Sequence, residues 1–166
     1  MALENSFVLE KLKSKFGEQI LSAEEPYCML TVTAVKDINL EILKYLYEDP
    51  ELQFQFMTDL CAVHYPDQLL QLCVVYHMHS LVNNHRLRLK FYLPIDNPVI
   101  QTATSVYAAA NWMERETFDF FGVIFEGHPN LKRILNVDTM DVYPLRKEYP
   151  LEDPNRVDKK DSFFGR

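Results

Sequence analysis

Glycine is scarce in this chain: only four of its 166 residues are glycine. None of them stands in a GxGxxG fingerprint or in a GxxxxGK[ST] loop, in which the backbone must pack closely against a phosphate. The scarcity therefore excludes nucleotide binding by either of these motifs.

Cysteine and positive charge are limited too. Cys28, Cys61 and Cys73 show no CxxC spacing, and an odd, sparse set of this kind indicates buried thiols in a reducing compartment. The formal net charge is −7, whereas binding of nucleic acid needs clustered Lys and Arg. We therefore expect no nucleic-acid partner, while a partner with a basic surface is compatible with this charge.

Long apolar runs are absent as well. No stretch approaches the roughly 20 residues that a membrane-spanning helix requires. The first residues, Met1 to Glu4, show neither the basic region of a signal peptide nor an Arg- and Ser-rich presequence. These features predict a cytoplasmic prokaryotic protein, with the processed form of an organellar protein as the alternative.

The chain does contain enough apolar sequence for one core. Hydrophobic residues make up 48% of it, which suits a single folded domain. Apolar and polar residues alternate with period two from Arg86 to Phe91, which is typical of a strand with one buried face. The predicted strands cover residues 27–35, 52–56, 70–79 and 86–91. The predicted helices cover residues 3–16, about 39–48 and about 102–121, and Gly122 ends the last of them.

This order of elements predicts an α+β fold in two layers, with a mainly antiparallel sheet, helices on one face and an extended C-terminal tail. We expect residues 1–122 to form the α+β domain and residues 123–166 to form an extended loop and a partner-docking tail. The segment from Pro144 to Leu151 alternates apolar anchors with charges between prolines. Prolines restrict the free chain, so such a peptide loses less entropy when it docks. A floppy terminus is the alternative.

Three carboxylates lie close together in the sequence, at Glu114, Glu116 and Asp119. On a helix, Glu114 and Glu116 point about 200° apart and cannot share one substrate, which disfavours acid–base catalysis. Arg115 and Asp119 are spaced i, i+4 and can form an ion pair. We interpret this run as a charged helix face, with an acid–base enzyme that also uses His128 as the alternative.

Histidine and basic residues raise further possibilities. His77 and His79 share one face of a predicted strand and His85 could approach them, but no carboxylate or thiol completes a zinc-binding set. We therefore favour a solvated or partner-facing polar face, and we interpret His128, which precedes a proline, as a structural turn residue. A basic stripe on the exposed face consists of Arg86, Arg88 and Lys90. Such a stripe either solvates the sheet or meets an acidic partner.

The sequence from Glu114 to Leu151 resembles that of one protein family. Glu114-Arg115-Glu116 is followed by the aromatic run Phe118 to Phe121, by His128, and by the basic and aliphatic run Lys132 to Leu135. Together with a weaker similarity around residues 58–66, where an Asp is more usual at His64, this pattern resembles the thirty-kilodalton subunit family of respiratory complex I, the NADH–quinone oxidoreductase. The resemblance spans roughly residues 50–153. The signature and interface residues that it implies are Glu114, Arg115, Glu116, Asp119, His128, Arg133, Pro144, Leu145, Arg146, Lys147 and Tyr149.

The resemblance implies a cofactor-free structural and assembly subunit in the hydrophilic arm of a proton-pumping NADH–quinone oxidoreductase. It implies docking onto the forty-nine-kilodalton subunit, which forms much of the quinone site, and contact with other hydrophilic-arm subunits. Flavin, iron–sulfur clusters and quinone are expected in the partner subunits, and no catalytic, cofactor-binding or metal-binding residue is expected in this chain. The implied location is peripheral, on the cytoplasmic side of the bacterial inner membrane, with membrane contact only through the complex. The alternatives are a subunit of a membrane-bound hydrogenase or of another quinone-reducing complex, an autonomous acid–base enzyme, and an adaptor in an unrelated complex.

Overall fold

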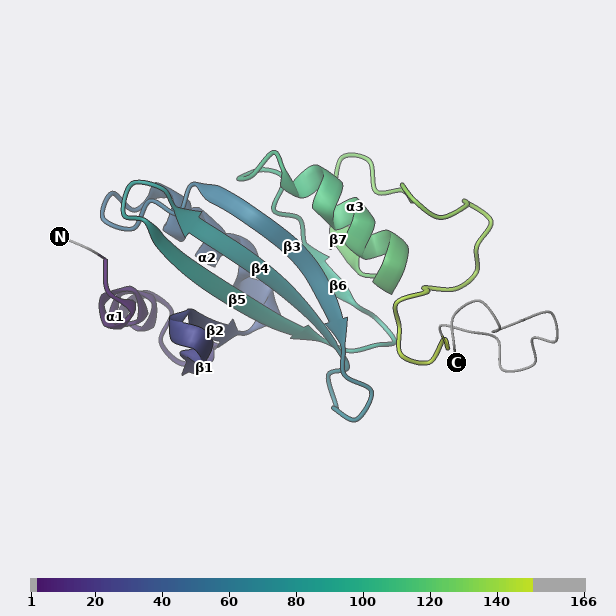
Figure 1. Cartoon of the computed structure of the whole chain (residues 1–166), viewed down its shortest axis with the longest axis horizontal. Coiled ribbons are helices and arrows are strands. Elements are labelled where there is room, and N and C mark those ends of the chain that lie inside the picture. The colour runs from purple at the N-terminus through teal and green to yellow at the C-terminus, as the bar shows by residue number, and fades with distance from the viewer. Residues whose placement is uncertain (1–2, 151–166) are drawn as a thin grey trace, which may run out of the picture.

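The computed structural model describes residues 3–150, which form a large sheet, helices and a smaller strand pair (Figure 1). The helices are α1 (Asn5–Phe16), α2 (Asn39–Glu48) and α3 (Ala110–Phe121). The large sheet contains β1 (Ile20–Glu24), β2 (Leu30–Ala34), β3 (Phe56–His64), β4 (Leu72–Ser80) and β5 (His85–Leu93). The strand pair contains β6 (Val99–Gln101) and β7 (Ile124–Glu126). Short 3-10 turns lie at Gly17–Gln19, Pro26–Cys28 and Lys36–Ile38.

The large sheet is mixed and has the strand order β1-β2-β5-β4-β3. β3, β4 and β5 form an antiparallel meander, and β1 pairs antiparallel with β2. β2 lies parallel to β5, because the chain leaves β2 through α2 and crosses over before it enters the meander. Antiparallel pairings predominate, so the predicted α+β fold with a mainly antiparallel sheet is confirmed.

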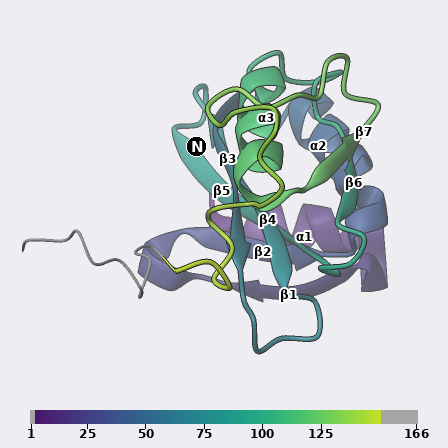
Figure 2. The same cartoon turned by 90° about the vertical axis from the view of Figure 1, so that its right-hand side faces the viewer.

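The core lies between one face of the sheet and the helices. Alternation along β5 places Leu87, Leu89 and Phe91 on the buried face, and the Phe91 ring meets Tyr76 edge-on at a centroid distance of 5.6 Å. Figure 2 shows α2 on the same side of strands β3 and β5 as the β6–β7 pair. The buried apolar residues that α1 and α2 add to this core are Val8, Leu12, Phe16, Ile42, Leu43 and Leu46.

The predicted strand over residues 52–56 is wrong. Leu52 and Phe54 are fully buried, but they lie in the loop between α2 and β3. β3 begins only at Phe56, whose side chain is half exposed. The apolar alternation here belongs to a loop that inserts alternate side chains into the core.

The other errors concern boundaries. The predicted helix from residue 102 begins only at Ala110, because residues 102–109 make turns after β6. β2 begins at Leu30 rather than at residue 27, and the sequence pattern does not predict β1. The end of α3 is confirmed: Gly122 takes a left-handed φ of 75°, and its N–H donates to the Phe118 carbonyl.

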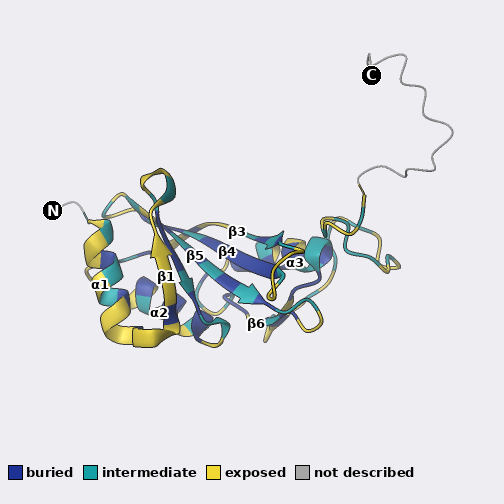
Figure 3. Cartoon of the chain, turned by 90° about the horizontal axis from the view of Figure 1, so that it is seen from below, coloured by how far each residue is buried: buried dark blue, intermediate teal, exposed yellow. Residues whose placement is uncertain are grey.

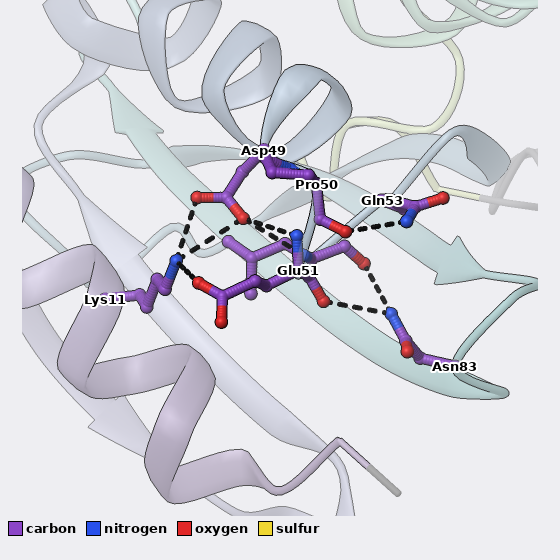
Figure 4. A network of polar contacts seen from close by, with 7 residues as sticks. Lys11, Asp49, Pro50, Glu51, Gln53 and Asn83 are labelled. Atoms are coloured by element: carbon purple, nitrogen blue, oxygen red, sulfur yellow. Dashed lines mark hydrogen bonds and ion pairs between the residues drawn. The ribbon is translucent and has the colours of Figure 1, made fainter. Parts of the chain in front are cut away.

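A polar network fixes the loop between α2 and β3 (Figure 4). The Lys11 ammonium pairs with Asp49 at 3.1 Å and also with Glu51, so it joins α1 to this loop. Asp49 Oδ1 accepts the N–H groups of Glu51 at 2.9 Å and Leu52 at 3.2 Å. Asn83, in the β4–β5 turn, donates to the carbonyls of Glu51 and Leu52 at 3.1 Å each. These bonds take the place of ladder bonds and hold Leu52 in the core.

Exposure of the three cysteines differs from the prediction. Figure 3 shows exposed residues along α1 and β1, and Cys28 follows β1 in an exposed turn. The expectation of buried thiols is therefore wrong for Cys28, whereas Cys73 is buried and Cys61 is half-buried. Burial raises the pKa of the Cys73 thiol to about 12 and that of the Cys61 thiol to about 11.

The chain beyond Gly122 first enters β7, which pairs in parallel with β6, and then runs to residue 150 without further helix or strand. The division after residue 122 into a domain and a docking tail remains a prediction. Residues 151–166, which belong to that predicted tail, lie outside the described residues. Within residues 3–150, no helix combines the length and the apolar character needed to cross a bilayer.

Candidate functional site

The signature residues lie on α3 and in the chain segment that follows it, and Asp119 joins the two. Its side chain is fully buried, yet both carboxylate oxygens have hydrogen-bond donors. Oδ2 accepts the backbone N–H groups of Ile134 at 3.1 Å, Leu135 at 2.8 Å and Asn136 at 2.9 Å. Oδ1 accepts Arg133 Nη1 at 2.8 Å and the Asn136 side-chain amide at 3.1 Å. We call this arrangement the Asp119 clamp.

The environment of the Asp119 clamp keeps the carboxyl ionised. Burial acts to raise the pKa of Asp119, but the N–H groups of Asn136 and Leu135 and the Arg133 guanidinium outweigh it. The net result is a pKa far below the usual range of an aspartic acid. The clamp therefore holds a fixed negative charge that binds the chain segment after β7.

Arg133 extends the clamp toward the C-terminal motif. Its Nη1 also donates to the Asp119 carbonyl at 2.9 Å, and its Nη2 donates to the carbonyls of Met140 at 2.8 Å and Val142 at 3.2 Å. The guanidinium carbon lies 5.2 Å from the centroid of the Tyr143 ring. A planar guanidinium with several fixed donors suits this role, in which one side chain fixes three carbonyls.

Arg115 does not pair with Asp119, so the predicted i, i+4 ion pair is wrong. The Arg115 guanidinium instead lies over the Trp112 ring, 4.8 Å from its centroid, and Nε donates to the Lys132 carbonyl at 3.3 Å. Asp119 is left to Arg133, which approaches from the loop after β7 and completes a buried ion pair. The ion pair joins two distant segments, whereas a pair within α3 would have left that loop unattached.

Glu114 is buried like Asp119, so the interpretation of this run as a charged helix face holds only for Glu116, although Asp119 does form an ion pair. Glu114 accepts the Ala103 N–H at 2.6 Å and the Thr102 hydroxyl at 2.5 Å. Burial raises the pKa of Glu114 to about 7, against these two hydrogen bonds. Glu116 alone among the three acids is exposed, so no two of the three acids flank a common open site.

His128 closes the turn that follows β7. Its Nε2 lies 3.1 Å from the Asn111 carbonyl, and its Nδ1 accepts the Asn130 N–H at 3.0 Å. Because a carbonyl only accepts, the contact with Asn111 assigns a proton to Nε2. Nε2 is 4.0 Å from the Glu114 carboxylate. Both ring nitrogens are thus occupied within the chain, as expected for a histidine that shapes a turn.

The Pro144–Tyr149 motif packs against the end of α3. Arg146 Nε donates to the Phe121 carbonyl at 2.8 Å, and the Leu145 N–H donates to the Phe120 carbonyl at 3.2 Å. The Arg146 guanidinium also lies 4.7 Å from the centroid of the Tyr143 ring. These bonds satisfy carbonyls at the C-terminus of α3 that the helix itself leaves open.

Two residues outside the predicted set complete this packing. His64, at the end of β3, is buried and accepts the Lys147 N–H on Nδ1 at 2.9 Å. Gly122 lies under Tyr143, and a Cβ at this position would come within 2.5 Å of Tyr143 Cε2. The sequence offers a signal for His64 only through the weak similarity around residues 58–66, and for Gly122 it predicts only helix termination.

The polar sheet residues do not form one free cationic stripe. Arg88 Nε donates to His77 Nε2 at 2.9 Å, and Lys90 pairs with Glu24 at 3.3 Å. Burial lowers the pKa of His77, and the positive charge of Arg88 lowers it further. Arg86 is the exposed member of the basic stripe that has no ion pair within the described residues.

Comparison with known proteins sets this geometry in context. The model of the family described as "Respiratory-chain NADH dehydrogenase, 30 Kd subunit" matches residues 32–155. The chain belongs to this family. It is 42% identical over 153 residues to the C subunit of NADH-quinone oxidoreductase from Citrifermentans bemidjiense, covering 92% of this chain and 94% of that protein. It is likewise 42% identical over 154 residues to the C subunit from Geobacter sulfurreducens, with 92% and 94% covered.

Two solved structures share the fold of this chain. A trypsin-resistant fragment of Nqo5 matches with a TM-score of 0.65 and 29% identity over 76% of this chain and 98% of that one. A chain of the archaeal membrane-bound sulfane sulfur reductase matches with a TM-score of 0.73 and 23% identity over 88% and 85%, which shows a shared fold. Residues 32–155, the part that matches the thirty-kilodalton subunit family, contain the whole Asp119 clamp.

Proposed function

We propose that this chain is a structural and assembly subunit of the hydrophilic arm of a proton-pumping NADH–quinone oxidoreductase, docking beside the forty-nine-kilodalton quinone-site subunit. The observation that carries the proposal is the Asp119 clamp. The signature charges Asp119 and Arg133 are engaged in intramolecular bonds that hold residues 133–143 in one conformation. A segment that is held in shape before it meets its partner loses less entropy on docking.

The same contacts disfavour an autonomous acid–base enzyme. Such an enzyme would use Glu114, Glu116 and His128, but Glu114 and His128 are enclosed by partners from their own chain. Glu116 is exposed on α3, apart from the buried Glu114. General acid–base catalysis needs a group within hydrogen-bond reach of a substrate, and neither buried group offers this.

The proposed docking surface is the exposed side of the clamp and of the Pro144–Tyr149 motif. Trp112 is 64% exposed and lies against the Arg115 guanidinium, and Leu145 is 47% exposed while its N–H donates to the Phe120 carbonyl. Lys147 is exposed while its backbone is fixed by His64. Aromatic and aliphatic anchors with a charged rim are the usual composition of a protein interface.

The proposal assigns flavin, iron–sulfur clusters and quinone to partner subunits, and none of them to this chain. It places the chain peripherally on the cytoplasmic side of the bacterial inner membrane, held there by the complex. The second candidate is a subunit of a membrane-bound hydrogenase or of another quinone-reducing complex. The same fold occurs in a chain of the sulfane sulfur reductase, a different respiratory membrane complex, which supports this second candidate. The identity of the co-purified partners separates the two.

The test is recovery of a tagged chain from detergent-solubilised native membranes. We expect stoichiometric NADH–quinone oxidoreductase subunits in the eluate, and roughly tenfold less of them with Lys147→Glu, because a reversed charge at an interface rim opposes association. Lys13→Glu, a reversal at an exposed position of α1, is the matched control and should change nothing. Arg115→Ala should lower the amount of complex but leave activity per complex nearly intact. Recovery of the wild-type chain alone, or full assembly with chemistry abolished in Arg115→Ala, would contradict the proposal.

A further inference from the structure

The turn between β1 and β2 holds two consecutive residues in the left-handed region. Tyr27 has φ 56° and ψ 36°, and Cys28 has φ 61°. For residues with a Cβ this region is sterically unfavourable, and it is entered mainly by Gly, Asn and Asp. In the β4–β5 turn the residue with a left-handed φ is Asn84, one of the residue types that enter this region readily. The β1–β2 turn therefore stores backbone strain that its sequence does nothing to relieve.

The strained turn presents a large aromatic side chain to solvent. Tyr27 is 98% exposed, more than any other large hydrophobic residue in residues 3–150. Figure 3 shows the turn as an exposed loop beyond the arrowhead of β1. The 3-10 turn at Pro26–Cys28 has one closing backbone bond, from the Met29 N–H to the Pro26 carbonyl at 3.2 Å. Contacts within residues 3–150 therefore do not explain why a tyrosine occupies this position.

The register of the sheet places a second exposed turn at the same end of the sheet as the first. β2 is parallel to β5, with Leu30 opposite Leu87, so the residues before each of them project from the same end of the sheet. Leu81 and Val82, in the β4–β5 turn, are 66% and 70% exposed. Asn83 fixes that turn to the loop after α2 through two hydrogen bonds, as Figure 4 shows.

A positive charge lies at the edge of these apolar residues. Arg86 is exposed and follows the β4–β5 turn, and it makes no ion pair with a described residue. It lines a hollow of about 240 Å³ together with Asp59 and with Met29, the residue that directly follows Cys28. We call this surface the Tyr27 patch, and it consists of Tyr27, Leu81, Val82 and Arg86.

We propose that the Tyr27 patch is a docking surface for another protein subunit, which offers an apolar pocket for the Tyr27 ring and a carboxylate for Arg86. The proposal rests on the proposed function, because it takes the partner from the same enzyme complex. An exposed aromatic on a strained turn is unfavourable for the isolated chain and becomes favourable once a partner buries it. Tyr is among the residues that dominate binding free energy when they fill a pocket, and Arg at the rim directs an acidic partner. The Tyr27 patch lies at the end of the large sheet that carries the β1–β2 turn. It shares no residue with the Asp119 clamp.

Cys28 supplies a probe without any substitution. It is exposed, whereas Cys61 is half-buried and Cys73 is buried, so a membrane-impermeant maleimide should label the isolated chain first at Cys28. In the assembled complex, labelling of Cys28 should be largely lost, because a partner that buries the Tyr27 ring also covers the residue next to it. Equal labelling of Cys28 in the isolated chain and in the assembled complex would overturn the proposal.

Three variants separate the ring from the backbone. Tyr27→Gly removes the ring and the strain, so it should raise Tm of the isolated chain by about 2–4 °C while weakening recovery of the complex by about thirtyfold. Cys28→Gly, the matched control, should raise Tm in the same way and leave recovery unchanged. Tyr27→Phe should keep most of the recovery, because the ring is the anchor. Normal recovery of Tyr27→Gly, or a fall in its Tm, would show that the ring serves its own chain and would overturn the proposal.

The partner is identified with a photo-crosslinking amino acid at position 27 in intact cells. A cross-link to another subunit of the enzyme supports the proposal, and a cross-link to a second copy of this chain overturns it in favour of self-association. The proposed function fails separately, when the tagged wild-type chain is recovered without NADH–quinone oxidoreductase subunits. In that case two results still decide whether the patch docks a protein. They are the protection of Cys28 and the opposite effects of Tyr27→Gly on Tm and on recovery of whatever partner co-purifies.

Discussion

Replacement of Asp119 by Asn is the sharpest perturbation of the clamp, because it keeps the shape of the side chain and removes its charge. Three backbone N–H groups and Arg133 converge on the carboxylate, and an amide offers only one oxygen to them. The other end of the amide is a donor and would face other donors. Breaking a buried ion pair on one side costs about 3–5 kcal/mol of unfolding free energy. For a chain of this size, the loss corresponds to a fall in Tm of roughly 6–20 °C.

The pH dependence of the same variant separates charge from shape. Because the pKa of Asp119 is lowered in the folded state, its stabilisation is fully present above the usual value of 3.8 and is lost as pH falls below it. The stability difference between wild type and Asp119→Asn, measured by urea unfolding, should therefore be constant from pH 8 to pH 5 and should shrink toward pH 3. Asp138→Asn, an exposed acid in the same loop, is the control. A difference that stays the same down to pH 3, or a loss below about 1 kcal/mol, would refute this account of the clamp.

Two further predictions concern neighbouring positions. Burial raises the pKa of Glu114 from 4.5 to about 7, so its neutral form stabilises the fold below about pH 4.5, and this contribution, about 3 kcal/mol, is lost as pH rises through 7. Glu114→Gln should thus gain stability relative to wild type between pH 5 and pH 9 in urea unfolding, and a flat difference would contradict the prediction. Gly122→Ala should lower unfolding free energy by about 1–3 kcal/mol, because it combines a positive φ with a clash against Tyr143. Adding Tyr143→Ala should recover part of that loss, and strictly additive losses in calorimetry would argue against the clash.

The sequence predicts those parts of the fold that depend on local periodicity. Leu87, Leu89 and Phe91 alternate with charged residues, and a half-buried strand is the conformation that separates the two sets. Leu52 and Phe54 show the same alternation but lie in a loop, because Asp49 and Asn83 satisfy the backbone there. Periodicity predicts which side chains are buried. It does not predict which groups form hydrogen bonds with the backbone N–H and C=O groups.

The candidate site shows the same limit. Glu114, Asp119 and Arg133 are all found from the sequence, but the partner of Asp119 is not. Local spacing favours Arg115, four residues earlier on the same helix, whereas the fold brings in Arg133 from beyond β7. His64 is missed for a related reason, since its contact with Lys147 joins segments that are distant in the sequence. Long-range pairings of this kind are fixed by tertiary packing, which a pattern within one helix does not report.

The parallel pairing of β2 with β5 also sets an order of events during synthesis of the chain. β1 and β2 leave the ribosome early, but the strand that flanks β2 on its other side consists of residues 85–93. A two-stranded hairpin is marginally stable at best in water, so residues 20–34 must wait with Leu30 and Val32 uncovered until β5 has been made. The β3–β4–β5 meander, by contrast, is built from neighbouring segments and closes as soon as it emerges. The N-terminal third of this protein is therefore translated first but completed only after β5 has been made.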